Sequence, residues 1–149
     1  MVEMRRTVIA AATVLIASGL GVLAQSNDPV AQRQSLMKNN QEQVRALTGM
    51  ARGQVPFNAA TARAAFQRIA QNAQQIPGLF PPGSNRGKTE ALPTVWERKA
   101  DFDARAAKLE QDAKAAEAGL TDQAGLQAAV QRVGQSCGGC HESYRRKES

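Results

Sequence analysis

The sequence comprises 149 residues with 19 Lys and Arg against 13 Asp and Glu, so its formal net charge at pH 7 is +6. This length accommodates one compact domain. Aromatic residues make up only 4% of the chain and are not interleaved with basic ones, which argues against nucleic acid as a partner.

The first 24 residues have the pattern of a secretory signal peptide. Arg5 and Arg6 precede an apolar run that ends at about Leu23, and small residues then offer a cleavage site. The alternative is a retained membrane anchor, but the run of roughly 17 residues is shorter than the ~20 that span a bilayer. We therefore expect residues 1–24 to be cleaved and residues 25–149 to form a periplasmic domain that the membrane does not hold.

A first helix is predicted from Pro29 to about Gly53. Asp28 is a suitable N-cap, proline is well tolerated at the first helical position, and glycine followed by Pro56 ends a helix. Helical periodicity places the following residues on its inner face: Val30, Arg33, Met37, Asn40, Val44, Leu47 and Ala51, with Leu36 and Met50 on the flank.

A second helix is predicted to begin after the N-cap Asn58 and to end at Pro77. Its inner face comprises Ala62, Phe66, Ile69, Ala73 and Ile76. The segment from Pro77 to Pro93 is rich in proline and glycine and is predicted to be a long loop within one domain.

Thr94 and Glu97 form a predicted capping box at the start of a third helix, which Gly119 closes. Its inner face comprises Val95, Phe102, Ala106, Leu109, Ala113 and Ala116. Thr121 or Asp122 opens a fourth helix. One side of this helix carries Leu126, Val130, Val133, Cys137, Cys140 and Tyr144.

Four helices of similar length with mostly short connections predict an all-α fold, an antiparallel up-down-up-down four-helix bundle. Alanine is abundant on every inner face, so the helices can approach closely. Bundles of this kind hold cofactors between facing helices.

The sequence Cys137-Gly138-Gly139-Cys140-His141 has the spacing of a c-type haem attachment site. Residues three or four apart on a helix lie about 5–6 Å from each other, so both thiols can react with the two vinyl groups on one edge of a porphyrin. The adjacent imidazole can then reach the iron as its proximal ligand. The motif therefore predicts one covalently attached haem c, bound through Cys137 and Cys140, with His141 on the metal.

Other uses of the same residues fit the chain less well. Zinc would need more ligands, but the sequence contains only two cysteines and one histidine. A thioredoxin-like dithiol would need a βαβ setting, and no strand pattern is present. A disulfide between the two cysteines would close only a very small ring, and a bundle without a cofactor would leave the motif unexplained.

The second axial ligand cannot be another histidine, because His141 is the only one. In an antiparallel bundle the end of the fourth helix lies beside the start of the first. His141 and Met37 are then both roughly 10–13 Å from the same end, whereas Met50 is about 20 Å further along. Met37 is thus the candidate sixth ligand, although a methionine at helical spacing can equally be core filler beside the haem.

The chain resembles class II c-type cytochromes, namely the cytochrome c′ family and its low-spin, methionine-ligated cytochrome c-556 relatives. The matching segments are 33–38 in the first helix, Trp96 with Phe102 in the third, and 137–145 at the end. The resemblance implies that Met37 in its Leu-Met-Lys context is the sixth ligand. It also implies haem contacts for Phe102, for Arg33 near a propionate and for Arg145 near the proximal imidazole.

From these features we expect an exported monohaem electron carrier rather than an enzyme, with redox proteins as partners and with monomer and homodimer both open. Arg145, Arg146 and Lys147 follow the motif and could guide such partners, although a solvated helix terminus explains them equally well. The alternative function is a five-coordinate, high-spin cytochrome c′ that binds or buffers NO or CO, with Met37 as a steric gate.

Overall fold

The computed structural model describes residues 27–147, so the predicted signal peptide lies outside the described residues. The helices are α1 (Pro29–Ala51), α2 (Ala59–Gln75), the 3-10 helix η1 (Ile76–Leu79), α3 (Thr94–Glu97), α4 (Lys99–Gly119) and α5 (Gln123–Tyr144). Over the described range the only β pairing is an isolated bridge between Ala91 and Arg145. None of these helices is long and apolar enough to cross a membrane.

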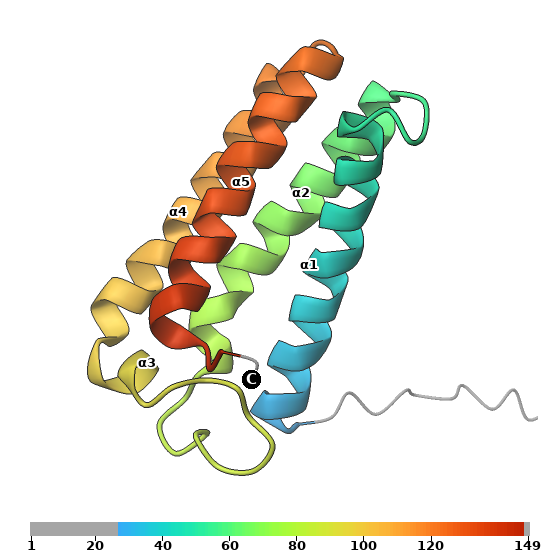
Figure 1. The fold of residues 1–149 in the computed structure, drawn as a ribbon. Helices are drawn as coiled ribbons and strands as arrows, with labels where there is room; N and C mark the ends of the chain where they lie inside the picture. The colour runs from blue at the N-terminus through green and yellow to red at the C-terminus, as the bar shows by residue number, and fades with distance from the viewer. Residues whose placement is uncertain (1–26, 148–149) are drawn as a thin grey trace, which may run out of the picture.

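The four long helices form the predicted antiparallel bundle (Figure 1). Helix α1 packs against α2 and α5, and α4 packs against the same two helices, so α1 and α4 occupy opposite corners of the bundle. The start of α1, the loop before α3 and the end of α5 all lie at one end of the molecule.

Local capping signals locate three of the helix starts. The carboxylate of Asp28 accepts a hydrogen bond from Val30 N, and Asn58 and Asp122 cap α2 and α5 in the same way through Thr61 N and Gly125 N. The predicted N-caps Asp28 and Asn58 are confirmed, and Asp122 is the cap of α5 rather than the alternative Thr121.

The predicted capping box at Thr94 is wrong. Helix α3 is a single turn without a side-chain cap, and the Thr94 hydroxyl instead donates to the carbonyl of Ser143 at 2.9 Å. The backbone leaves the helical conformation at Arg98, where φ is −123° and ψ is 44°, so α4 begins at Lys99. A tertiary hydrogen bond to α5 has replaced the local one that the spacing indicates.

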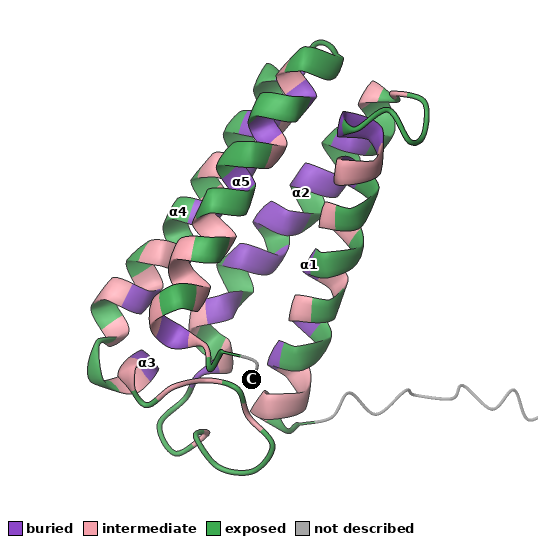
Figure 2. Cartoon of the chain, viewed as in Figure 1, coloured by how far each residue is buried: buried purple, intermediate pink, exposed green. Residues whose placement is uncertain are grey.

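The buried residues form stripes along the inner faces of all four long helices (Figure 2). The buried stripe of α1 is rotated from the predicted face toward Leu36 and Met50. Met50 belongs to the core with 3% of its surface exposed, although periodicity placed it on the flank. Met37 and Val44, by contrast, are only half-buried and pack against the edge of the core.

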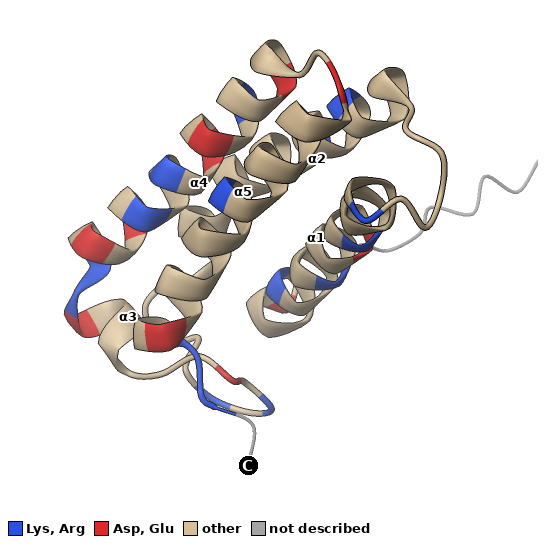
Figure 3. Cartoon of the chain, turned by 45° about the horizontal axis from the view of Figure 1, so that its top comes forward, with Lys and Arg blue, Asp and Glu red and all other residues tan. Residues whose placement is uncertain are grey.

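Acidic and basic residues are interspersed along α4 (Figure 3). Four ion pairs link residues four apart on this helix, at N–O distances of 2.5–2.9 Å: Lys99–Asp103, Asp101–Arg105, Lys108–Asp112 and Glu110–Lys114. Such pairs each add only a few tenths of a kcal/mol to an exposed helix. The pair of Asp101 and Arg105 differs from the others because both residues also contact α5.

Candidate functional site

The cysteines and the histidine of the predicted attachment motif lie within helix α5. Cys137 and Cys140 are both free thiols and half-buried, and burial raises the pKa of each. They pack against the edge of the hydrophobic core. Both sulfur atoms are therefore available for covalent attachment, and the helix keeps them three residues apart as the motif requires.

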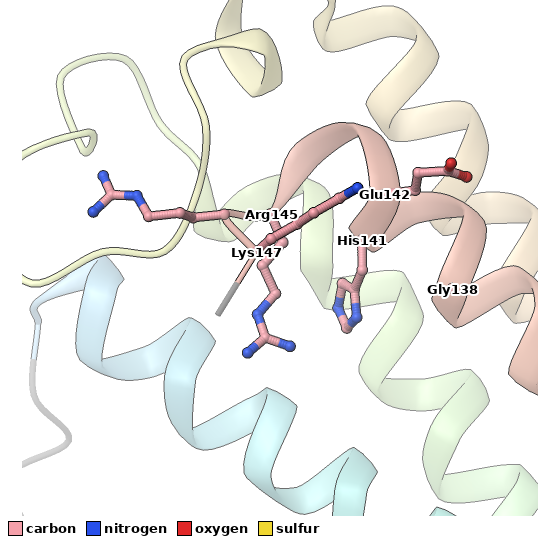
Figure 4. A pocket seen from close by; sticks show the side chains of 6 residues that line it. Gly138, His141, Glu142, Arg145 and Lys147 are labelled. Atoms are coloured by element: carbon pink, nitrogen blue, oxygen red, sulfur yellow. The ribbon is translucent and has the colours of Figure 1, made fainter. Parts of the chain in front are cut away.

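His141 faces a pocket of about 350 Å³ at the end of α5 (Figure 4). The pocket is lined by Gly138, His141, Glu142, Arg145, Arg146 and Lys147. Burial lowers the pKa of the imidazole, and the nearby charge of Arg145 lowers it further. His141 is therefore neutral at pH 7, which is the protonation state that a metal ligand needs.

Space for a large group exists beside the attachment motif. A Cβ atom added to Gly138 would have no neighbouring atom within 4 Å, although this glycine lies between two half-buried cysteines. Two thiols, a neutral imidazole, and a pocket beside that imidazole with cations in its lining match the needs of a covalently bound haem with two propionates. The residues present therefore fit this cofactor.

Met37 lies on α1, the neighbour of α5 at this end of the bundle. Helix α5 ends at Tyr144, so His141 is about 4.5 Å from the helix end, less than the predicted depth. Met37 is about 12 Å from the start of α1. Figure 1 shows the start of α1 and the end of α5 at the same end of the bundle.

Met50 is at the opposite end of the bundle. Its carbonyl accepts a hydrogen bond from the side chain of Gln123, the first residue of α5, at 3.3 Å. Gln123 and His141 are 18 residues apart on one helix, or about 27 Å. Met50 is therefore far from the imidazole, as the sequence predicted.

Arg33 is buried and bound to the loop that precedes α3. Its guanidinium donates four hydrogen bonds: to the carbonyls of Leu79 and Ser84 and to the hydroxyls of Ser84 and Thr89, at 2.6–3.4 Å. It also lies 4.6 Å from the ring centroid of Phe80. The contact of Arg33 with a haem propionate stays a prediction. The structure shows in addition that this side chain links α1 to the segment before α3.

Phe102 is buried in a cluster of aromatic rings at the same end of the bundle. It packs edge-on against Phe80 at 4.7 Å and against Tyr144 at 5.3 Å between ring centroids. Phe80 also contacts Trp96 at 6.0 Å. This cluster connects α4, the loop and the last turn of α5.

The loop before α3 is joined to the end of α5 by backbone hydrogen bonds. Leu92 N donates to the carbonyl of Tyr144, and Arg146 N donates to the carbonyl of Glu90. Arg145 pairs with Ala91 in the isolated bridge, and its backbone N–H donates to the carbonyl of His141. Arg145 thus lines the same pocket as His141, and its predicted contact with the haem stays a prediction.

Sequence analysis missed Arg105 and Asp101. The Arg105 guanidinium donates to the carbonyl of Gly139 at 2.7 Å, inside the attachment motif, and Tyr144 donates to Asp101. Their spacing of four residues indicates an ion pair on α4. No sequence signal indicates that this pair faces the motif, which is 34 residues further along the chain.

Comparisons with known proteins agree with this site. The profile of the family described as "Cytochrome C'" matches residues 28–145. A cytochrome c-556 from Agrobacterium tumefaciens (strain II Chrys) is 42% identical over 120 residues, which cover 80% of this chain and 98% of the relative.

Two solved structures from Rhodopseudomonas palustris share the fold. Its cytochrome c′ has a TM-score of 0.79 and 36% identity, over 82% of this chain and 98% of that protein. Its oxidised cytochrome c556 has a TM-score of 0.75 and 32% identity, over the same shares of the two chains.

A four-helix bundle with a haem attachment motif on its last helix defines a class II c-type cytochrome. The profile match covers most of the sequence, and the relatives exceed 30% identity. The chain belongs to the cytochrome c′ family, which includes cytochromes c-556. It is a cytochrome that carries one covalently attached haem c and transfers electrons.

Proposed function

We propose that this protein is an exported electron carrier whose single haem is bound through thioethers to Cys137 and Cys140 and ligated by His141 and Met37. The observation that carries the proposal is the position of His141 in its pocket at the end of α5, beside the first turns of α1 on which Met37 lies. Met50 is bound to the opposite end of α5 and is no candidate.

Bound haem supplies a one-electron couple between ferrous and ferric iron. The neutral imidazole of His141 offers a nitrogen lone pair, because burial and Arg145 keep its pKa low. The thioether of Met37 is a soft ligand, which favours the ferrous state and raises the reduction potential relative to an open position.

The site supports electron exchange with partner proteins rather than turnover of a substrate. His141 is the only histidine and is committed to the iron, so no imidazole remains for acid–base chemistry. We assign the mature protein to the periplasm, because the signal-peptide pattern of residues 1–24 indicates export and c-type haem is attached outside the cytoplasm.

One observation favours a second function. The chain is similar to a cytochrome c′ as well as to cytochromes c-556. In the second reading Met37 covers a five-coordinate iron as a steric gate, and the protein binds NO or CO.

The visible spectra of the holoprotein and of Met37→Leu distinguish the electron-carrier function from the gas-binding function. Leucine nearly preserves the volume of methionine but has no sulfur, so it removes a ligand with little change in packing. We expect a low-spin parent spectrum. Met37→Leu should convert it to high-spin, lower the reduction potential and allow CO to bind.

Met50→Leu is the matched control, because it makes the same chemical change on the same helix about 20 Å away. Its spectrum and potential should equal those of the parent. A high-spin parent whose coordination is unchanged by Met37→Leu would contradict the ligand assignment and favour the gas-binding function.

A further inference from the structure

We infer that Arg105 and Asp101 of α4 are positioning residues for the haem. Together they bind the segment 139–144 of α5 at its two ends and thereby orient the imidazole of His141. The inference rests on the proposed assignment of His141 as the proximal ligand. Neither side chain belongs to the attachment motif.

The first contact between this pair and α5 is at the carbonyl of Gly139, which lies between the two cysteines. Arg105 Nη1 donates to this oxygen at 2.7 Å. Gly139 lacks a Cβ, and one built there would be 3.8 Å from the same nitrogen, so the guanidinium lies directly against the backbone of the motif. A hydrogen bond from a charged donor is among the stronger ones in proteins.

The second point is the hydroxyl of Tyr144, three residues after His141. It donates a hydrogen bond to Asp101 Oδ2, the same oxygen that accepts from Arg105 Nε at 2.9 Å. Tyr144 is buried, and its ring packs edge-on against Phe102. These bonds lower the pKa of Asp101, with Tyr144 as the larger cause and Arg105 next.

Two points of attachment restrain a helix more than one does. Gly139 and Tyr144 are five residues apart, or about 7.5 Å along α5, and Cys140 and His141 lie between them. A single bond would leave the helix end free to rotate about that contact. Two bonds to one carboxylate–guanidinium pair oppose both rotation and sliding of the segment that carries the imidazole.

The pair also places charge beside the attachment site. Arg105 Nη1 donates to the carbonyl of Gly139, the residue before Cys140, and Arg105 Nε is 2.9 Å from Asp101 Oδ2, so one cation and one anion lie beside the motif. Reduction of the iron adds one negative charge, so a nearby cation favours the ferrous state and a nearby anion opposes it. Loss of Arg105 should therefore lower the reduction potential, and loss of Asp101 should raise it.

The test uses the holoprotein and its variants Arg105→Met, Arg105→Lys and Asp101→Asn. We measure the reduction potential and the EPR spectrum of the ferric state, which reports the orientation of the axial ligands. Arg105→Met should lower the potential and produce a second or broadened set of EPR signals. Arg105→Lys should restore the potential but not the single EPR species, because an ammonium lacks the fork that reaches Asp101 and Gly139 together.

Asp101→Asn should shift the potential in the direction opposite to Arg105→Met, which a loss of folding in either variant would not produce. Lys114→Met is the matched control, since Lys114 pairs with Glu110 at 2.5 Å on the same helix but nine residues further on. This control should leave the potential and the EPR spectrum of the parent unchanged.

Unchanged EPR signals and an unchanged potential in Arg105→Met would overturn the inference. Equal effects of Arg105→Met and Lys114→Met would overturn it as well, because they would reflect net charge alone. A parent holoprotein without a histidine-ligated iron would instead contradict the proposed function, so the two failures are distinguishable.

Discussion

Arg33 is the only charged side chain among residues 27–147 that is buried, with 4% of its surface exposed. A buried charge is tolerated only when hydrogen bonds replace the water that it has lost. Four loop acceptors and the faces of Phe80 and Trp96 provide this replacement. One residue of α1 thus holds the loop that closes the haem end of the bundle.

We predict that Arg33→Met reduces the free energy of unfolding of the holoprotein by about 2–4 kcal/mol. The substitution fits the space but leaves the carbonyls of Leu79 and Ser84 without their donor. Urea denaturation measures the loss. Arg45→Met, on the exposed face of the same helix, should change stability by less than about 0.5 kcal/mol. Equal losses in the two variants would show that the loop contacts of Arg33 contribute nothing.

At the scale of secondary structure, glycine has opposite effects in two helices: α1 ends before Gly53, whereas α5 continues through Gly134. Beyond the C-cap Arg52 the chain forms a Schellman motif: Gly53 N donates to the carbonyl of Met50, and Gln54 N donates to that of Gly49. Gly53 has a φ of +70°, which only glycine adopts without cost. Helix α5, in contrast, passes through Gly134 on its exposed side without interruption.

These two glycines should respond to alanine in opposite directions. Gly134→Ala should stabilise the protein by about 0.5–1 kcal/mol, because alanine favours the helix and its Cβ would meet nothing within 4 Å. Gly53→Ala should destabilise it by about 1 kcal/mol or more, because its φ is left-handed. Thermal unfolding of both holoproteins provides the check. A lower melting temperature for Gly134→Ala would indicate that this face of α5 is covered, contrary to the structure.

Over the whole molecule, the charges are unevenly placed. Four of the five acidic groups of α4 are paired with cations of the same helix. The loop and the last described residues, in contrast, carry an exposed basic rim that consists of Arg86, Lys88, Arg146 and Lys147. Figure 3 shows these basic segments close to the C-terminus. The hydrogen bond from Arg146 N to the carbonyl of Glu90 brings the two segments together at the end where His141 lies.

The basic rim should accelerate electron exchange with acidic partners. We predict that the double variant Arg146→Gln/Lys147→Gln slows association with a purified acidic electron-transfer protein about three- to tenfold at low ionic strength. Salt should reduce the difference, since it screens exposed charges. Stopped-flow kinetics across a salt series measures both effects.

The control is Lys108→Gln/Lys114→Gln, which removes the same charge from α4, away from the site. Its association rate should change much less than that of the rim variant. Identical slowing in both double variants would mean that net charge, and not the basic rim, attracts the partner.

The sequence by itself determined the features that depend on neighbouring residues. The N-caps Asp28, Asn58 and Asp122 and the stop at Gly53 act within one turn, so their spacing locates most helix ends. The four-helix bundle follows from these helices and their short connections. The motif at residues 137–141 predicted the cofactor, because the two thiols and the imidazole need only one helix to align them.

Tertiary structure decided the contacts between residues far apart in sequence. The loop partners of Arg33 are 46–56 positions away, and Arg105 reaches Gly139 across 34 positions. Thr94 has cap chemistry, but its hydroxyl bonds to Ser143 because α5 ends beside it. Met50 is buried although periodicity places it on the flank of the inner face of α1. A periodic pattern indicates which face of a helix is buried, but only the packing of several helices determines which side chains from separate helices meet.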